Sequence, residues 1–157
     1  MKRQRGMVLV LALVFSLLLG LLAASALRDA LVDMRMAATL RDGLQAFEEA
    51  EGTLLAGLSA LRQAALPACQ GCPPPPRPHE LHGHWQASSS GYFQLQNLGE
   101  TSNAIHMPEA EQVTLYRVTA VSRQQAARQV LEAVYAVPTA QAQAPRRILW
   151  RQRLKED

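Results

Sequence analysis

The apolar residues at the start of the chain form one long uninterrupted run. From Met7 to Leu27 no residue carries a charge, and the polar side chains are those of Ser16 and Ser25. About 20 apolar residues in a helix span the hydrocarbon core of a bilayer, and inside lipid a helix satisfies its own backbone groups. The pattern therefore predicts a transmembrane helix.

The helical pattern continues beyond this run. Residues 28–65 contain no proline and are rich in good helix formers. Apolar residues recur there at spacings of three and four, which predicts an amphipathic helix. They are Leu40, Leu44, Phe47, Leu54, Leu58 and Leu61, with Glu51 in the skipped place. A helix over residues 7–65 would be about 90 Å long, and we expect its second half to be the spine of a soluble domain.

Charge sets the expected orientation in the membrane. Lys2, Arg3 and Arg5 precede the apolar run, and positive flanks stay in the cytoplasm. We therefore expect an inner-membrane protein with a single pass and a periplasmic C-terminal domain. A cleavable secretory signal is the competing interpretation, because residues 23–26 (AASA) suit a signal peptidase, although its apolar core is usually shorter.

Composition adds little to this picture. The formal net charge of the 157 residues is +3, and no basic, aromatic cluster of the kind that binds nucleic acid is evident. We therefore expect no nucleic-acid partner.

Several motifs near the N-terminus follow one another in a specific order. A basic leader ends in Gly6, directly before the apolar run. Further along the helix come residues 34–37 (MRMA), 40–42 (LRD) and 46–51 (AFEEAE). On these motifs residues 1–60 resemble the PilX family of minor pilins, which are subunits of type IV pili. The resemblance implies that a prepilin peptidase cuts after Gly6 and methylates the new N-terminus at Met7.

The resemblance also implies a fold and a set of partners. The fold would be α+β and pilin-like, with the long N-terminal helix packed against a small antiparallel sheet. The expected partners are the prepilin peptidase, inner-membrane lipid, other minor pilins and, as a further filament subunit, the major pilin. No cofactor is implied. The expected segments are a leader (1–6), a transmembrane half (7–27), an amphipathic half (28–65), a Cys/Pro-rich linker (66–91) and a β-rich part (92–157).

One position departs from the pattern of major pilins. Most of them carry glutamate as the fifth residue of the mature chain, where this chain has Leu11. In a filament that acid is thought to pair with the N-terminal amine of the adjacent subunit. Its absence, shared with PilX-like minor pilins and with the type II secretion pseudopilin GspK, suggests a place at or near the fibre tip, in an initiation complex. A GspK-like pseudopilin is the alternative function.

The remaining chain predicts a sheet. Prolines between residues 67 and 78 exclude helix there, and strand-like stretches cover residues 92–96, 113–121 and 147–153. Residues 127–137 fit helix or strand by period. We favour a strand, because a hairpin through a turn at residues 122–125 would complete a pilin-like sheet.

Two groups of residues are candidates for chemistry. Cys69 and Cys72 would lie in an oxidising compartment, where disulfides persist. We therefore expect them to form a small disulfide loop between the end of the helix and the proline-rich linker. With His79, His82 and His84 they also suit zinc or a redox loop, which defines an alternative class: a membrane-anchored envelope protein with a Cys/His site.

The acidic cluster of the helix is the second group. Glu48 and Glu49 are expected to be solvated, whereas Glu51 interrupts the apolar stripe and is expected to contact the sheet or a neighbouring subunit. Nothing in the sequence argues for an enzyme, and we assign no catalytic, cofactor-binding or metal-binding residue.

Overall fold

The computed structural model describes residues 4–63, 66–69, 71–139 and 144–155. Residues 1–3 of the expected leader and residues 64–65, where we expected the helix to end, lie outside these ranges. The elements are α1 (Gln4–Leu61), the short 3₁₀ helix η1 (Pro78–Glu80), β1 (Gln86–Ala87), β2 (Gly91–Thr101), β3 (Val113–Ser122), β4 (Val130–Pro138) and β5 (Arg146–Arg153). The chain divides into two compact units, Met1–Arg41 and Asp42–Asp157.

The first unit consists of the N-terminal part of α1. Among the described residues, α1 is the one helix long and apolar enough to cross a membrane. A stretch of 18 residues within it has a mean hydropathy of 2.9, and no part of that stretch is buried. Its hydroxyl groups bond within the helix: the Ser16 hydroxyl donates to the Ala12 carbonyl at 2.9 Å, and the Ser25 hydroxyl to the Leu22 carbonyl at 2.9 Å. These polar groups therefore remain satisfied in an apolar medium.

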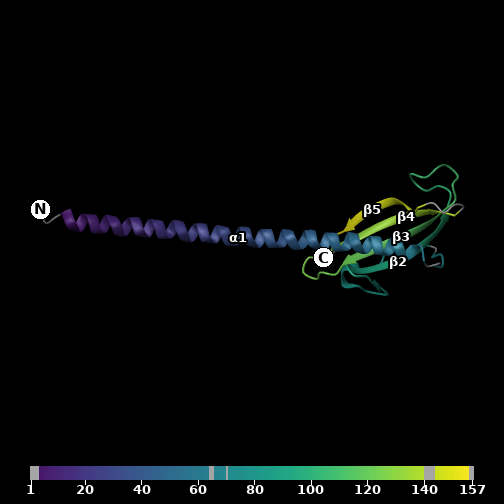
Figure 1. Ribbon diagram of the computed structural model, residues 1–157, viewed down its shortest axis with the longest axis horizontal. Helices are drawn as coiled ribbons and strands as arrows, with labels where there is room; N and C mark the ends of the chain where they lie inside the picture. The colour runs from purple at the N-terminus through teal and green to yellow at the C-terminus, as the bar shows by residue number, and fades with distance from the viewer. Residues whose placement is uncertain (1–3, 64–65, 70, 140–143, 156–157) are drawn as a thin grey trace. The chain divides into compact units, whose positions relative to one another are not determined.

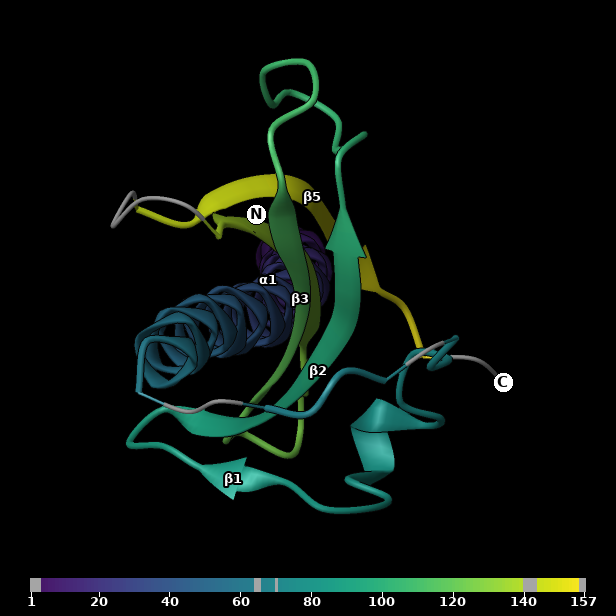
Figure 2. The ribbon, with the colours of Figure 1, turned by 90° about the vertical axis from the view of Figure 1, so that its right-hand side faces the viewer.

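The second unit is built on an antiparallel sheet. Its described residues form five strands in the order β1-β2-β3-β4-β5, so that each strand pairs with its neighbour in sequence (Figures 1 and 2). Residues of α1 from Ala46 to Leu61 pack on this sheet. The expected α+β, pilin-like fold, a long N-terminal helix with an antiparallel sheet, is confirmed.

The strands agree with the sequence pattern in position and differ in length. All four expected stretches are strands, including the ambiguous one, which forms β4 over Val130–Pro138. Residues of β4 are buried along nearly the whole strand, because both faces of the sheet are covered there. This explains why the sequence of β4 lacks the alternation of a half-exposed strand. The two-residue strand β1 was not expected.

The buried face of α1 is made of small residues. Ala46, Ala50 and Thr53 are fully buried together with Leu54, whereas Leu44 is 67% exposed. The leucine stripe expected from the sequence is thus partly wrong, because the helix face against the sheet carries the small side chains that permit close approach. A Cβ at Gly57 would lie 2.5 Å from Val118 Cγ1. The apolar core beneath the helix is formed by Leu54, Leu61, Val118, Ala120, Ala133 and Tyr135.

Asn97 fixes the chain where it leaves the helix. Its side-chain amide donates to the Leu66 carbonyl at 2.8 Å, and its side-chain oxygen accepts from the Gly99 backbone at 2.9 Å. The backbone carbonyl of Asn97 accepts a hydrogen bond from the Cys69 backbone N–H at 2.8 Å. A bulge in β2 between Asn97 and Gly99 accompanies these bonds. The outer border of β2 is thereby partly closed by the chain itself.

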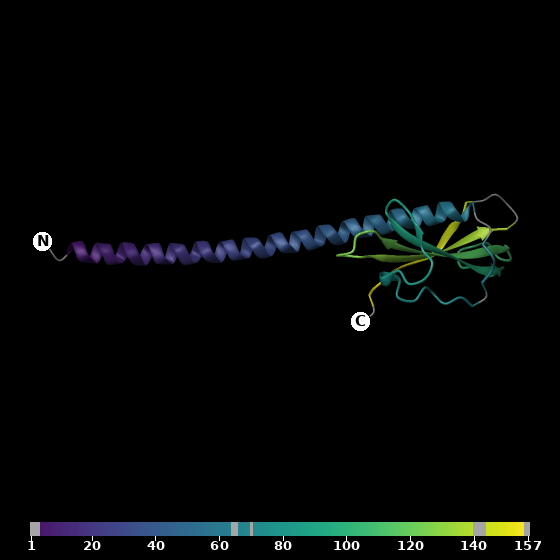
Figure 3. The ribbon, with the colours of Figure 1, turned by 90° about the horizontal axis from the view of Figure 1, so that it is seen from below.

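The linker forms a third layer. We name residues 72–78 the proline segment. In Figure 3 the part of the linker that contains it lies on the side of the sheet opposite to the last turns of α1. Pro75 and Pro78 are buried against this face. The proline segment, expected to be part of a linker, therefore also covers this face of the sheet.

Candidate functional site

The residues expected to carry processing and assembly lie at the start of α1. Gly6 and Met7 are both within the helix. The Met7 side chain is 74% exposed, and that of Leu11 is 61% exposed. Gly6 and Met7 therefore lie in the first turns of α1.

The apolar surface of this part of α1 is exposed on all sides. Leucine, valine, phenylalanine and methionine side chains along it remain open to the surroundings; between Met7 and Leu22 they are Met7, Val8, Leu9, Val10, Leu11, Leu13, Val14, Phe15, Leu17, Leu18, Leu19, Leu21 and Leu22. An apolar surface this extensive requires lipid or other apolar helices around it.

The two cysteines are joined. Cys69 and Cys72 form a disulfide with their Cα atoms 5.7 Å apart. Each end of this short loop is attached to the sheet: the Cys69 backbone donates to the Asn97 carbonyl, and the Cys72 carbonyl accepts from Arg117 Nη1 at 3.1 Å. The disulfide therefore lies where the chain passes from the end of the helix to the far face of the sheet.

The histidines of the linker do not gather around the cysteines. His82 Nδ1 lies 3.3 Å from Glu80 Oε2 at the surface. In the described ranges no three or more His, Cys, Asp or Glu side chains are placed to hold a metal ion.

The acidic residues of α1 contact the sheet in two places. Glu51 Oε1 accepts a hydrogen bond from Trp150 Nε1 of β5 at 3.2 Å, and the Trp150 ring meets the Phe47 ring edge-on at a centroid distance of 6.3 Å. Glu49 Oε2 accepts from the Gln124 backbone, in the β3–β4 connection, at 2.9 Å. The expected contact of Glu51 with the sheet is thus present. The expectation that Glu49 is solvated was wrong, because its partner lies 75 residues away in the chain and only the fold brings the two together.

Tyr135 lies beside the Glu51 contact. Burial raises the pKa of the Tyr135 phenol above its ordinary value of 10.0, the positive charge of Arg147 opposes this rise, and the negative charge of Glu51 adds to it. A hydrogen bond with the Arg147 side chain also lowers the pKa. Because burial dominates, the phenol remains protonated to higher pH than an exposed tyrosine.

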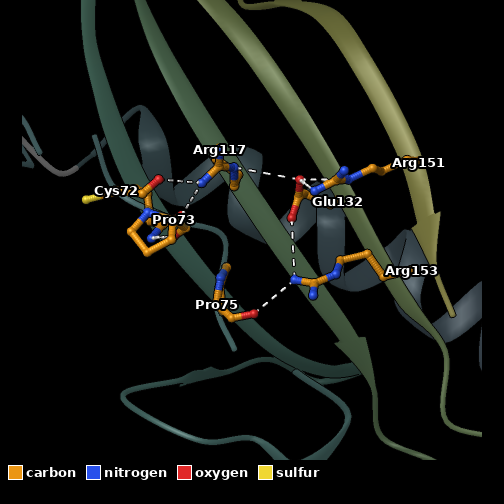
Figure 4. A network of polar contacts seen from close by, with 8 residues as sticks. Cys72, Pro73, Pro75, Arg117, Glu132, Arg151 and Arg153 are labelled. Atoms are coloured by element: carbon orange, nitrogen blue, oxygen red, sulfur yellow. Dashed lines mark hydrogen bonds and ion pairs between the residues drawn. The ribbon is translucent and has the colours of Figure 1, made fainter. Parts of the chain in front are cut away.

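A buried charge cluster occupies the other face of the sheet (Figure 4). The Glu132 side chain, on β4, is 2% exposed. Among the described residues, three arginines lie within ion-pair distance of it. Arg151 Nη2 is 2.7 Å from Glu132 Oε1, Arg117 Nε is 3.7 Å from the same oxygen, and Arg153 Nη1 is 3.9 Å from Oε2. A buried carboxylate is tolerated only where such partners compensate its lost hydration.

The arginines of this cluster also hold the proline segment. Proline has a carbonyl acceptor and no N–H donor, so a run of prolines cannot pair with itself, and its carbonyls accept from other residues or from water. Arg153 Nη1 donates to the Pro75 carbonyl at 2.9 Å, and Gln96 Nε2 donates to the Pro73 carbonyl at 3.0 Å. Arg117 Nη1 bonds the Cys72 carbonyl in the same row. Glu132 thus gathers the cations that bind the proline segment (Figure 4).

Sequence reasoning missed this cluster, although a signal was present. Glu132 is the one acid in the otherwise apolar stretch from Val130 to Val137. Arg151 and Arg153 are two residues apart on a strand and so share a face. An isolated acid in a buried strand, together with alternating arginines on a later one, indicates a cross-strand ion pair.

Comparison of the chain with protein-family models, with curated proteins and with solved structures found no match.

Proposed function

We propose that this protein is a structural minor pilin of the PilX type that takes part in type IV pilus assembly. The observation that supports the proposal is the combination of two features in one helix. The N-terminal part of α1 is apolar and exposed on all sides, and the C-terminal part is the spine of a domain with an antiparallel sheet. Before assembly the exposed part is anchored in inner-membrane lipid, and in the fibre it packs among the helices of partner subunits.

Leu11 supports a particular place in the fibre. After cleavage behind Gly6, Leu11 is the fifth residue of the mature chain. Its apolar side chain offers no charge to the N-terminal amine of a neighbouring subunit, whereas its own amine at Met7 stays available. We therefore place the protein at or near the tip, in an initiation complex with other minor pilins, where it supports fibre formation, twitching motility and adhesion.

The mature N-terminus is the decisive test. The full chain is expressed with and without a prepilin peptidase, and its N-terminus is determined by intact mass and peptide sequencing. We expect a chain that begins at N-methylated Met7 in the presence of the peptidase and at Met1 in its absence. A Gly6→Val variant, which alters only the residue before the cut, is expected to remain uncleaved. In the presence of the peptidase, cleavage near Ala26 or a chain that still begins at Met1 would overturn the proposal.

Deletion of the gene distinguishes a type IV pilus from a type II secretion system, the two filament systems that share this processing. Loss of surface fibres and twitching with intact protein secretion supports the pilus assignment. Loss of secretion with intact fibres indicates a GspK-like pseudopilin instead. Restoration by the wild-type chain, and not by the Gly6→Val variant, ties either phenotype to processing.

A further inference from the structure

The two borders of the sheet differ in how far the chain covers them. At the β2 border, β1 pairs with Tyr92 and Phe93, and the Cys69 backbone bonds the Asn97 carbonyl. At the opposite border, β5 is hydrogen-bonded to β4 and, within the described ranges, has no strand on its outer side (Figure 1). An unpaired border of this kind is a template for an additional strand.

The side chains along β5 combine apolar and basic character. Leu149 and Trp150 are 46% and 40% exposed, which is high for large apolar residues. Arg146, Arg147 and Arg151 are also exposed. The register of β5 with β4 places Trp150 opposite Ala133, in the core beneath α1, and Arg151 opposite Glu132 on the other face. By the same register Arg146, Leu149 and Arg153 share the face of Arg151, and Arg147 shares the face of Trp150, where it is hydrogen-bonded to Tyr135. The face that bears Arg151 is therefore the more basic of the two.

Charge disfavours a second copy of β5 as the occupant. Two β5 strands side by side would bring arginines of one against arginines of the other, and like charges on neighbouring strands are destabilising. An extended segment that carries acidic residues is attracted by the same arginines. On the face that bears Trp150, an apolar side chain would lie beside the indole ring and the Phe47 ring that it meets.

We propose that β5 is a docking edge for an extended segment of another protein in which apolar and acidic residues alternate. Backbone hydrogen bonds to β5 supply affinity, as in other cases of strand addition. The apolar side chains lie on the face that bears Trp150, and the acidic side chains lie on the face that bears Arg151. The proposal is independent of the function proposed above, since it rests on the second unit alone.

A synthetic peptide tests the proposal directly. The probe is a peptide of eight residues that alternates valine and glutamate, matched to the 8 residues of β5. The full chain carries 2 tryptophans, so a Trp85→Phe variant in non-ionic micelles leaves Trp150 as the fluorescent reporter. We expect saturable binding that changes Trp150 fluorescence. The same peptide methylated at every backbone nitrogen is expected to bind more than about tenfold more weakly, because its hydrogen bonds to β5 are lost.

Charge variants test the electrostatic part. A peptide that alternates valine and lysine is expected to bind at least about tenfold more weakly than the glutamate peptide, since several cross-strand pairs change from attraction to repulsion. Arg146→Glu is expected to weaken binding of the glutamate peptide by about 2- to 5-fold. Arg62→Glu makes the same charge change at an exposed site outside β5 and is expected to leave binding unchanged.

Three outcomes would overturn the proposal. They are absence of saturable binding by the glutamate peptide, equal binding of its methylated form, and equal binding of the lysine peptide. Peptide binding does not depend on processing at Gly6, so failure here leaves the pilin assignment intact, and failure of N-terminal cleavage leaves the docking edge intact.

Discussion

Gly57 leaves no room for a side chain between α1 and the sheet. A Cβ there would lie 2.5 Å from Val118 Cγ1 and 3.3 Å from Phe93 Cδ2. Val118 is fully buried and Phe93 is 5% exposed, so neither side chain can yield without disturbing the core. At Gly43, on the same helix, an added Cβ would have no neighbour within 4 Å.

The two glycines predict opposite effects of the same substitution. Gly57→Ala is expected to lower the free energy of unfolding by about 1–3 kcal/mol, because the methyl group overfills a packed contact. Gly43→Ala is expected to raise it by up to about 1 kcal/mol, because alanine is the better helix former. Chemical unfolding of the full chain in micelles measures both. A Gly57→Ala variant as stable as Gly43→Ala would contradict the close packing.

Tyr135 predicts how stability depends on alkaline pH. Its phenol has a pKa raised above 10.0 in the folded protein, chiefly by burial. As pH rises above the ordinary value, the unfolded chain loses this proton first, which favours unfolding. The stability present below that value is therefore lost as pH rises through the folded pKa. We expect the free energy of unfolding to fall less steeply in Tyr135→Phe than in the wild type, with Tyr92→Phe as control. Parallel pH profiles for all three proteins would contradict this assignment.

At the scale of elements, the sequence pattern was sufficient for the helix and for the position of each strand except β1. The apolar run and the proline-free stretch require a helix, and β-branched residues mark β3. The face of α1 that packs on the sheet was harder to predict. Ala46, Ala50 and Gly57 are only weakly hydrophobic and are buried there because they are small. The Glu132 cluster was missed because Arg117 and Arg151 lie on separate strands, and only the sheet register brings them together.

The sheet and the proline segment are coupled through Glu132. Glu132→Gln keeps the size of the side chain and removes the charge that Arg117 and Arg153 face in a largely buried setting. We expect the free energy of unfolding to fall by about 3 kcal/mol, the effect of breaking a buried ion pair. Glu80→Gln removes the charge of a half-exposed surface partner of Arg77 and is expected to change stability by less than about 0.5 kcal/mol. If Glu132→Gln and Glu80→Gln had the same free energy of unfolding, the ion pairs of Glu132 would contribute nothing to stability.

At the scale of the whole molecule, the two units have different requirements for stability. Every buried side chain of the apolar core lies at Ala46 or beyond, whereas the apolar residues from Met7 to Leu40 are exposed. The first unit needs lipid or partner helices around it, and the second unit contains its own core. The N-terminal part of α1 therefore contributes little to the folding of the second unit.

This division predicts where the chain can be shortened. A fragment of residues 42–157 retains the whole described core and is expected to be soluble without detergent and to unfold cooperatively, as small single domains do. A fragment of residues 55–157 lacks Ala46, Ala50, Thr53 and Leu54, all fully buried or nearly so. It leaves the helix-facing side of the sheet partly uncovered, and we expect it to aggregate or to lack a cooperative transition. Circular dichroism and thermal unfolding distinguish the two outcomes. If the longer fragment also failed to fold, the second unit would depend on the N-terminal part of α1, and the separation of anchoring from folding would be wrong.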